Sequence, residues 1–204
     1  MLLAVDVGNT NVVFALFEAG SVKAGDTVLV QGTGGVSLFA LQFALLAGAR
    51  VIATSSSEEK LERVLNMGAA AGINYKTTPA WEEKVRELTN GRGVDHVVEV
   101  GGAGTLTKSL RAVRTSGQVS LIGVLAGGAA EVNTFPILMK SIRVQGIFVG
   151  SRAMFEAMNR AIQAHQLHPV VDRVFSFGEA REAYRHLESG THFGKVVIRV
   201  ESSS

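Results

Sequence analysis

Residues 28–37 combine a short apolar run, a glycine turn and the start of a helix. The run Val-Leu-Val-Gln is typical of a buried strand, and Gly-Thr-Gly-Gly follows it directly. Gly32 can adopt the positive φ that a tight turn needs, and Gly34 has no side chain to block a phosphate. Ser37 stands where the third glycine of a G-x-G-x-x-G pattern would be. Because amides at a helix start favour an anion, the segment predicts a dinucleotide site.

A second apolar run at 50–54 completes a strand-helix-strand unit, which favours the dinucleotide interpretation over an ordinary glycine-containing turn. Further strands are expected at 73–75, 94–100, 118–123 and 143–149. Helices are expected at 58–67, 79–90 and 106–113, the first begun by Ser56 with Glu59 three residues on. This alternation predicts an α/β fold, a Rossmann-type doubly wound parallel sheet with its ligand at the carboxyl ends of the strands.

Smaller elements are expected at the two ends of the chain. Runs at 2–7 and 12–17 around a Gly/Asn turn predict an N-terminal β-hairpin. Helices at 154–166 and 179–188, with strands at 170–175 and 195–200, are expected near the C-terminus. Open strand edges invite association, so the hypothesis is that the hairpin docks on them or that a second copy covers them as a homodimer.

Composition excludes several classes of function. The 204 residues carry a net charge of +2 without a basic run, which argues against nucleic-acid binding. The absence of cysteine excludes disulfides and thiolate chemistry and is compatible with a cytoplasmic protein. Polar residues interrupt the apolar N-terminus, so neither a signal peptide nor a membrane span is expected. His165 and His168 lie three apart, but no third ligand is evident, so no metal site is expected.

Several motifs together resemble one enzyme family. They are Lys-Ala-Gly-Asp at 23–26, Gln-Gly-Thr-Gly-Gly-Val at 31–36, Gly-Arg-Gly-Val-Asp at 91–95, Glu-Val-Gly-Gly at 99–102 and Phe-Gly-Lys-Val-Val at 193–197. Over about 21–200 the chain resembles the cofactor-binding half of medium-chain dehydrogenases/reductases, the zinc-type alcohol dehydrogenase and quinone reductase group. The resemblance implies an NAD(P)-binding domain of a hydride-transferring oxidoreductase. The family's zinc ligands and substrate pocket belong largely to its other domain. We therefore expect that the chain holds no zinc, and that it binds the cofactor without full catalysis.

The opening residues resemble a different family. The stretch 1–11, Met-Leu-Leu-Ala-Val-Asp-Val-Gly-Asn-Thr-Asn, is similar to type III pantothenate kinases, in which this turn contacts ATP phosphate. The change of family near residue 20 suggests a chimera. The expected units are a kinase-like hairpin at 1–20, a dinucleotide-binding domain at 21–150, packing helices and strands at 151–200, and a tail at 201–204. The alternatives are a non-catalytic engineered scaffold, or a kinase-like fragment that binds nucleotide through 6–11.

The end of the second strand bears on the choice of cofactor. NAD sites place an acid there to bind the ribose, whereas the family alignment puts Ser55 in that position. Serine does not repel a 2′-phosphate, so NADP is favoured over NAD; helix capping by the serines and a solvated face for Lys60 are the alternative readings. The expected cofactor contacts, with no catalytic residue among them, are Gly32, Thr33, Gly34, Gly35 and Val36 at the turn, Ser55, Ser56, Lys60 and Tyr75 at the adenosine ribose, and Gly101, Gly123, Val149 and Gly150 at the nicotinamide end.

Overall fold

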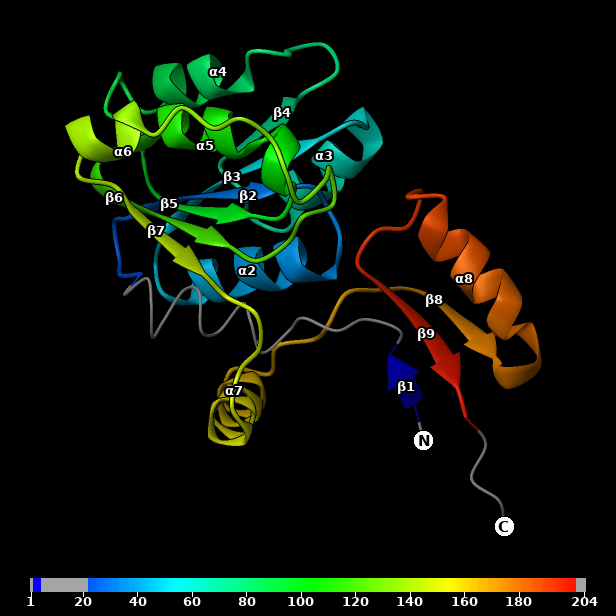
Figure 1. Cartoon of the computed structure of the whole chain (residues 1–204). Coiled ribbons are helices and arrows are strands. Elements are labelled where there is room, and N and C mark those ends of the chain that lie inside the picture. Colours follow the sequence, from blue (N-terminus) through cyan, green and yellow to red (C-terminus); the bar gives the residue numbers. More distant parts are fainter. Residues whose placement is uncertain (1, 5–21, 201–204) are drawn as a thin grey trace.

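A computed structural model describes residues 2–4 and 22–200 of the chain, and its main feature is a six-stranded parallel sheet (Figure 1). The strand order is β4-β3-β2-β5-β6-β7. The direction of winding reverses between β2 and β5, as in Rossmann-type sheets. The α/β doubly wound fold predicted from the sequence is confirmed. The strands are β2 (Thr27–Gln31), β3 (Arg50–Ser55), β4 (Ala71–Asn74), β5 (Val94–Glu99), β6 (Val113–Leu121) and β7 (Arg143–Gly146).

Helices cover both faces of this sheet, which explains its apolar strands. On one face, α2 (Gly35–Leu46) and α3 (Glu58–Asn66) pack against Val28 and Val30 of β2. On the other, α4 (Trp81–Leu88) and α5 (Leu106–Ala112) pack against Leu29. Figure 1 shows α2 below the sheet and α4 and α5 above it. Side chains that alternate along β2 therefore enter two separate cores.

A second, three-stranded sheet has the order β1-β9-β8. Strand β1 (Leu2–Ala4) pairs antiparallel with β9 (Lys195–Arg199), and β8 (Val171–Ser176) pairs parallel with β9. The first strand of the expected hairpin thus covers one edge of β9, as hypothesised, while its second strand at 12–17 lies outside the described residues. Helix α7 (Arg152–Ala164) precedes β8, and α8 (Ala180–Glu188) joins β8 to β9 after a short 3-10 turn, η3 (Phe177–Glu179).

Several boundaries differ from those expected from the sequence. Strand β6 begins at Val113 rather than at 118, because Val113 already pairs with Val94; the register with β5 then shifts, so that residues 114–117 form an irregularity within the strand. Strand β7 ends at Gly146 rather than at 149, since its partner strand ends opposite it at Leu121. The five-residue helix α6 (Phe135–Met139) was not expected.

The N-cap of α3 is Ser57, not Ser56 as expected. The Ser57 hydroxyl accepts a hydrogen bond from the Lys60 amide at 3.3 Å, and its extended backbone meets the requirement of an N-cap. The predicted capping box of Ser56 with Glu59 is therefore wrong, and capping does not account for a serine at position 56.

His96 gives the fold a dependence on pH. Its side chain is 2% exposed, Nε2 lies 2.8 Å from the Ser120 hydroxyl, and burial lowers its pKa from 6.5 to about 4. The unfolded chain binds this proton near pH 6.5 and the folded chain only near pH 4, so stability is full above pH 6.5 and falls as the pH drops. We expect a loss of about 3 kcal/mol from this group across the window.

Urea unfolding from pH 7 to 4.5 tests this expectation. His96→Gln should flatten the acid slope, because the glutamine takes up no proton when the chain unfolds. An equally steep slope in His96→Gln would contradict the assignment.

Candidate functional site

The glycine turn after β2 lies at the carboxyl edge of the main sheet. Gly32 has φ +73°, which accounts for a glycine there, and its amide donates to the Thr54 carbonyl of β3 at 2.8 Å. The Ser37 hydroxyl donates to the Gln31 carbonyl at 2.5 Å and is buried beneath the turn. Backbone geometry and two hydrogen bonds therefore fix the path from β2 into α2.

Gly34 has neither of the usual structural reasons to be glycine. Its φ is −77°, which any residue can adopt, and a Cβ built on it would meet no atom within 4 Å. It is the N-cap of α2, a 12-residue helix whose first amides have no partner within the helix. The space beside Gly34 thus adjoins backbone amides that the helix itself does not use, and any side chain at position 34 would narrow this space. These residues fit a phosphate-bearing ligand.

The predicted ribose-side residues gather at the next two strand ends. Ser55 ends β3 and is 3% exposed, and its carbonyl accepts from the Tyr75 amide at 3.0 Å. Tyr75 is 42% exposed, and Ser56, which follows Ser55 in the sequence, is half-buried. Ser55 Oγ accepts from the Ser57 amide at 3.3 Å rather than capping the helix. The structure therefore brings Ser55, Ser56 and Tyr75 to one corner of the edge.

Lys60 is engaged within the protein. Its Nζ donates to the Gly190 carbonyl at 2.8 Å. Burial lowers the pKa of this ammonium, an effect that the charge of Asp172 partly opposes. Arg63, one turn further along α3, lies over the Phe193 ring at 3.8 Å from its centroid. Sequence reasoning missed Arg63, although its spacing of three from Lys60 places both cations on one helix face.

The loop before β9 docks on the glycine turn. The Gly194 amide donates to the Thr33 carbonyl at 2.9 Å, and Gly34 and Gly194 form a parallel bridge. Gly194 has φ +90° and packs so closely on Val170 that a side chain would clash with its carbonyl. The Phe193 amide donates to Asp172 Oδ1 at 3.0 Å. This contact, which the sequence did not predict, attaches the three-stranded sheet to the candidate site.

The predicted nicotinamide-side residues follow β5, β6 and β7. A Cβ on Gly101 would clash with the Thr105 hydroxyl, and one on Gly123 would lie 2.6 Å from the Val100 carbonyl. The protein's own packing therefore accounts for both glycines. Val149 is 61% exposed, and Gly150 is half-buried just before the N-cap of α7. Because Gly101, Gly123 and Gly150 have no side chain, a ligand at this edge would meet their backbones.

Glu99 lies at the crevice between the carboxyl ends of β2 and β5, and the sequence did not predict it as a site residue. It ends β5, is 0% exposed, and its carboxylate accepts hydrogen bonds from both sides of the crevice between β2 and β5. The signal for it was a single acid in the otherwise apolar run at 97–100, followed by two glycines.

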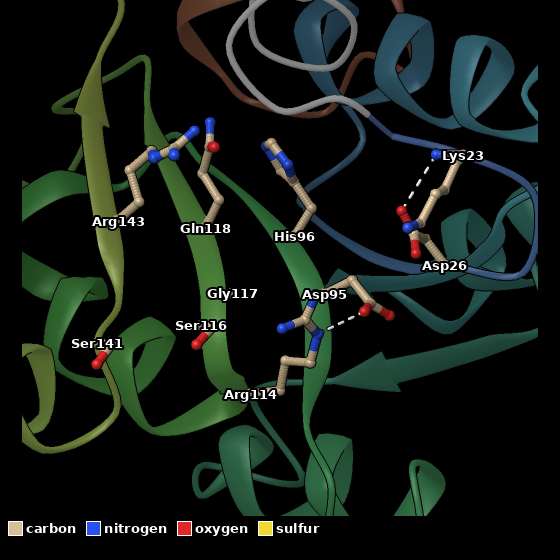
Figure 2. Close-up of a pocket in the computed structure, with 10 residues that line it drawn as sticks. All are labelled: Lys23, Asp26, Asp95, His96, Arg114, Ser116, Gly117, Gln118, Ser141 and Arg143. Atoms are coloured by element: carbon tan, nitrogen blue, oxygen red, sulfur yellow. Dashed lines mark hydrogen bonds and ion pairs between the residues drawn. The ribbon is translucent and has the colours of Figure 1, made fainter.

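A cavity of about 340 Å³ lies at the opposite end of the sheet, near the amino ends of β2, β5, β6 and β7 (Figure 2). Asp95 at its wall accepts from Arg114 Nε at 2.5 Å and from Arg92 Nη2 at 2.6 Å. Burial would raise the pKa of this carboxyl, but the two guanidinium groups hold it below its ordinary value. Because open α/β sheets bind ligands at carboxyl ends, this cavity is not the candidate dinucleotide site.

Two further properties concern metals and membranes. Within residues 2–4 and 22–200, no three His, Asp or Glu side chains gather closely enough to hold a metal ion, so the described residues do not fit a zinc site. Both His165 and His168 are exposed. No helix in these same ranges has the length and apolar character needed to cross a bilayer.

Comparison with known proteins gives consistent matches. Residues 35–164 match the family model described as zinc-binding dehydrogenase. A zinc-type alcohol dehydrogenase-like protein of Schizosaccharomyces pombe is 48% identical over 184 residues, which cover 88% of this chain and 53% of that protein. A solved NAD-dependent alcohol dehydrogenase has a TM-score of 0.88 at 34% identity, covering 95% of this chain and 57% of that one.

A mycobacterial protein solved in complex with NADPH has a TM-score of 0.83 at 29% identity, covering 94% of this chain and 63% of that one. The chain spans about half the length of the curated relatives it matches. The family match over residues 35–164 and these relatives confirm the resemblance to zinc-type alcohol dehydrogenases.

The two turn glycines should respond differently to substitution. Gly34→Asp should keep or slightly raise stability, because aspartate is a favoured N-cap and this cap lacks a side-chain hydrogen bond. Gly32→Ala should lose about 1 kcal/mol or more, because its positive φ strains a residue with a Cβ. Urea unfolding measures both, and an equal loss in the two variants would contradict this reading of the turn.

Proposed function

Because the chain belongs to the zinc-binding dehydrogenase family, we propose that it binds a nicotinamide dinucleotide across the carboxyl edge of its six-stranded sheet. The observation that carries the proposal is Gly34, an unstrained glycine with open space beside it at the start of α2. The pyrophosphate lies against the backbone of residues 32–36. Helix amides and the helix dipole both favour an anion there.

The cofactor in this proposal is NADP in preference to NAD. An acid at the end of β3 would repel a 2′-phosphate by about 4 kcal/mol at 4 Å and an effective dielectric of 20, and serine removes that term. Ser56 and Tyr75 offer hydroxyl donors at this corner, and Lys60 with Arg63 adds positive charge. The nicotinamide end then meets the backbones of Gly101, Gly123, Val149 and Gly150. Solved relatives include both an NAD-dependent enzyme and a complex with NADPH.

The activity of the family, in this proposal, is hydride transfer between NAD(P)H and an alcohol, carbonyl compound or enone. The chain spans 53% of its fission-yeast relative, and its described residues do not fit a zinc site. We therefore propose that these residues hold the cofactor and do not by themselves turn over a substrate. Within the chain, 21–150 forms the cofactor domain and 151–200 packs on it. The kinase-like interpretation of 1–20, the chimera, the tail at 201–204, a homodimer through strand edges and a cytoplasmic location remain predictions.

Calorimetric titration with NADPH, NADH and ATP tests the proposal. Wild type should bind NADPH saturably. Gly34→Asp should stay folded but lose that binding, because its carboxylate would fill the space beside position 34 and repel the pyrophosphate. Gly178→Asp is the matched control, at an exposed glycine of η3 where an added Cβ would meet the Ser176 hydroxyl only at 4.0 Å. Folded wild type that binds neither dinucleotide would contradict the proposal and favour a scaffold. Binding of ATP alone, lost in Asp6→Ala, would favour the kinase-like fragment.

The choice of cofactor has its own test at Ser55. Ser55→Asp should weaken NADPH binding by about tenfold or more, because it places a carboxylate beside the 2′-phosphate, and should leave NADH binding equal or stronger. Ser55→Asn introduces a side chain of nearly the same shape as aspartate but without its charge. It should therefore change the ratio of the NADPH and NADH affinities little. The measurement is the ratio of dissociation constants in each variant, and an unchanged ratio in Ser55→Asp would contradict the ribose-side assignment.

A further inference from the structure

The Glu99 carboxylate joins the two sides of the crevice at which the strand order reverses. Oε1 accepts from the amides of Gly101 at 2.8 Å and Gly102 at 3.0 Å and from the Thr105 hydroxyl at 2.5 Å. Oε2 accepts from Gln31 Nε2 at 2.8 Å and from the Ser109 hydroxyl. With five donors around a side chain that is 0% exposed, its acceptor sites are filled from within the protein.

On the β2 side, the network reaches the glycine turn. Gln31 immediately precedes Gly32, and its side chain is held at both ends. Its Nε2 also donates to the Ser109 hydroxyl at 2.7 Å, and its Oε1 accepts from the Val100 amide at 3.2 Å. The residue that leads into the phosphate-binding turn is thus fixed to β5 and α5.

On the β5 side, the network orders two successive loops. Glu99 holds the amides that begin the 3-10 turn η2 (Gly102–Gly104). The next loop then bonds to this one: the Ala126 amide donates to the Gly101 carbonyl at 2.8 Å, and the Ala103 amide donates to the Gly127 carbonyl at 3.0 Å. Residues 101–105 and 124–127 therefore take their positions from the same carboxylate.

Stability alone is a weak reason to keep a charge here. Burying a carboxylate carries a desolvation penalty, and apolar groups of similar volume often stabilise a core equally well. What the carboxylate provides is geometry, because it fixes donors from β2, α5 and the loop after β5 around one group. A dinucleotide must contact the turn after β2 and the loops after β5 and β6 at once, so its binding depends on the spacing between them.

We propose that Glu99 is a positioning residue that sets this spacing, so that the two halves of one dinucleotide reach their sites together. The inference rests on the proposed function. It assigns Glu99 to binding of the whole cofactor and not to binding of the adenosine half, which meets the turn after β2 and the ends of β3 and β4, all on one side of the crevice.

The test compares two ligands, NADPH and adenosine 2′,5′-bisphosphate, which is the adenosine half alone. Glu99→Gln keeps the shape but turns a hydrogen-bond donor toward other donors. It should weaken NADPH binding by about tenfold or more and leave the bisphosphate affinity within about twofold. Calorimetry gives both dissociation constants, and circular dichroism checks the fold.

Asp95→Asn is the matched control. Asp95 is a buried carboxylate at the other end of the same strand and accepts from the Thr27 amide, Arg92 and Arg114. Figure 2 shows its contact with Arg114. Asp95→Asn should lower the free energy of unfolding and leave the ratio of the NADPH and bisphosphate affinities unchanged. If Glu99→Gln fails to fold, Thr105→Val removes one donor with little change of volume and should shift the ratio in the same direction by a smaller factor.

Three outcomes distinguish the claims. A selective loss of NADPH affinity in Glu99→Gln or Thr105→Val supports the positioning role. Equal losses for both ligands, or the same change of ratio in Asp95→Asn, would reduce Glu99 to a structural residue and overturn the inference while leaving the proposed function intact. Wild type that binds neither ligand would overturn the proposed function and this inference with it.

Discussion

The turn at Gly32 is the constraint on which the carboxyl edge of this protein depends. Strand β2 has to end and reverse into α2 within a few residues, and a φ of +73° makes that possible. Both neighbouring strands hold the turn, since its amide bonds to Thr54 of β3 and Gln31 bonds to Glu99 of β5. The first amides of α2 consequently face the crevice where α/β sheets bind ligands.

Much of the fold was predictable because its signals are local. Buried parallel strands are short apolar runs bounded by glycine, so all six strands of the main sheet were expected close to where they lie. Details that depend on a partner strand were not predictable. The irregularity at 114–117 within β6 follows from the register of this strand against β5. Ser57 rather than Ser56 caps α3 because its hydroxyl reaches the Lys60 amide.

In the candidate site, too, the local features were predictable from the sequence and the long-range contacts were not. The glycine turn is contiguous in sequence and was predicted, whereas the bond between Gln31 and Glu99 joins residues 68 positions apart. The docking of Gly194 on Thr33 is equally long-range. Sequence also cannot tell one glycine from another: Gly34 borders open space, while Gly101 is small because Thr105 fills the space beside it. That difference is the strongest reason to place a ligand at Gly34.

Amide NMR spectra recorded during titration with NADPH test the location of the ligand most directly. If the dinucleotide lies across the carboxyl edge, the largest shifts belong to the amides of residues 34–37, followed by those of 101–105, while Ser116 and Gly117 in the opposite cavity stay unchanged. Shifts concentrated at Ser116 and Gly117, with residues 34–37 unaffected, would contradict the proposed site.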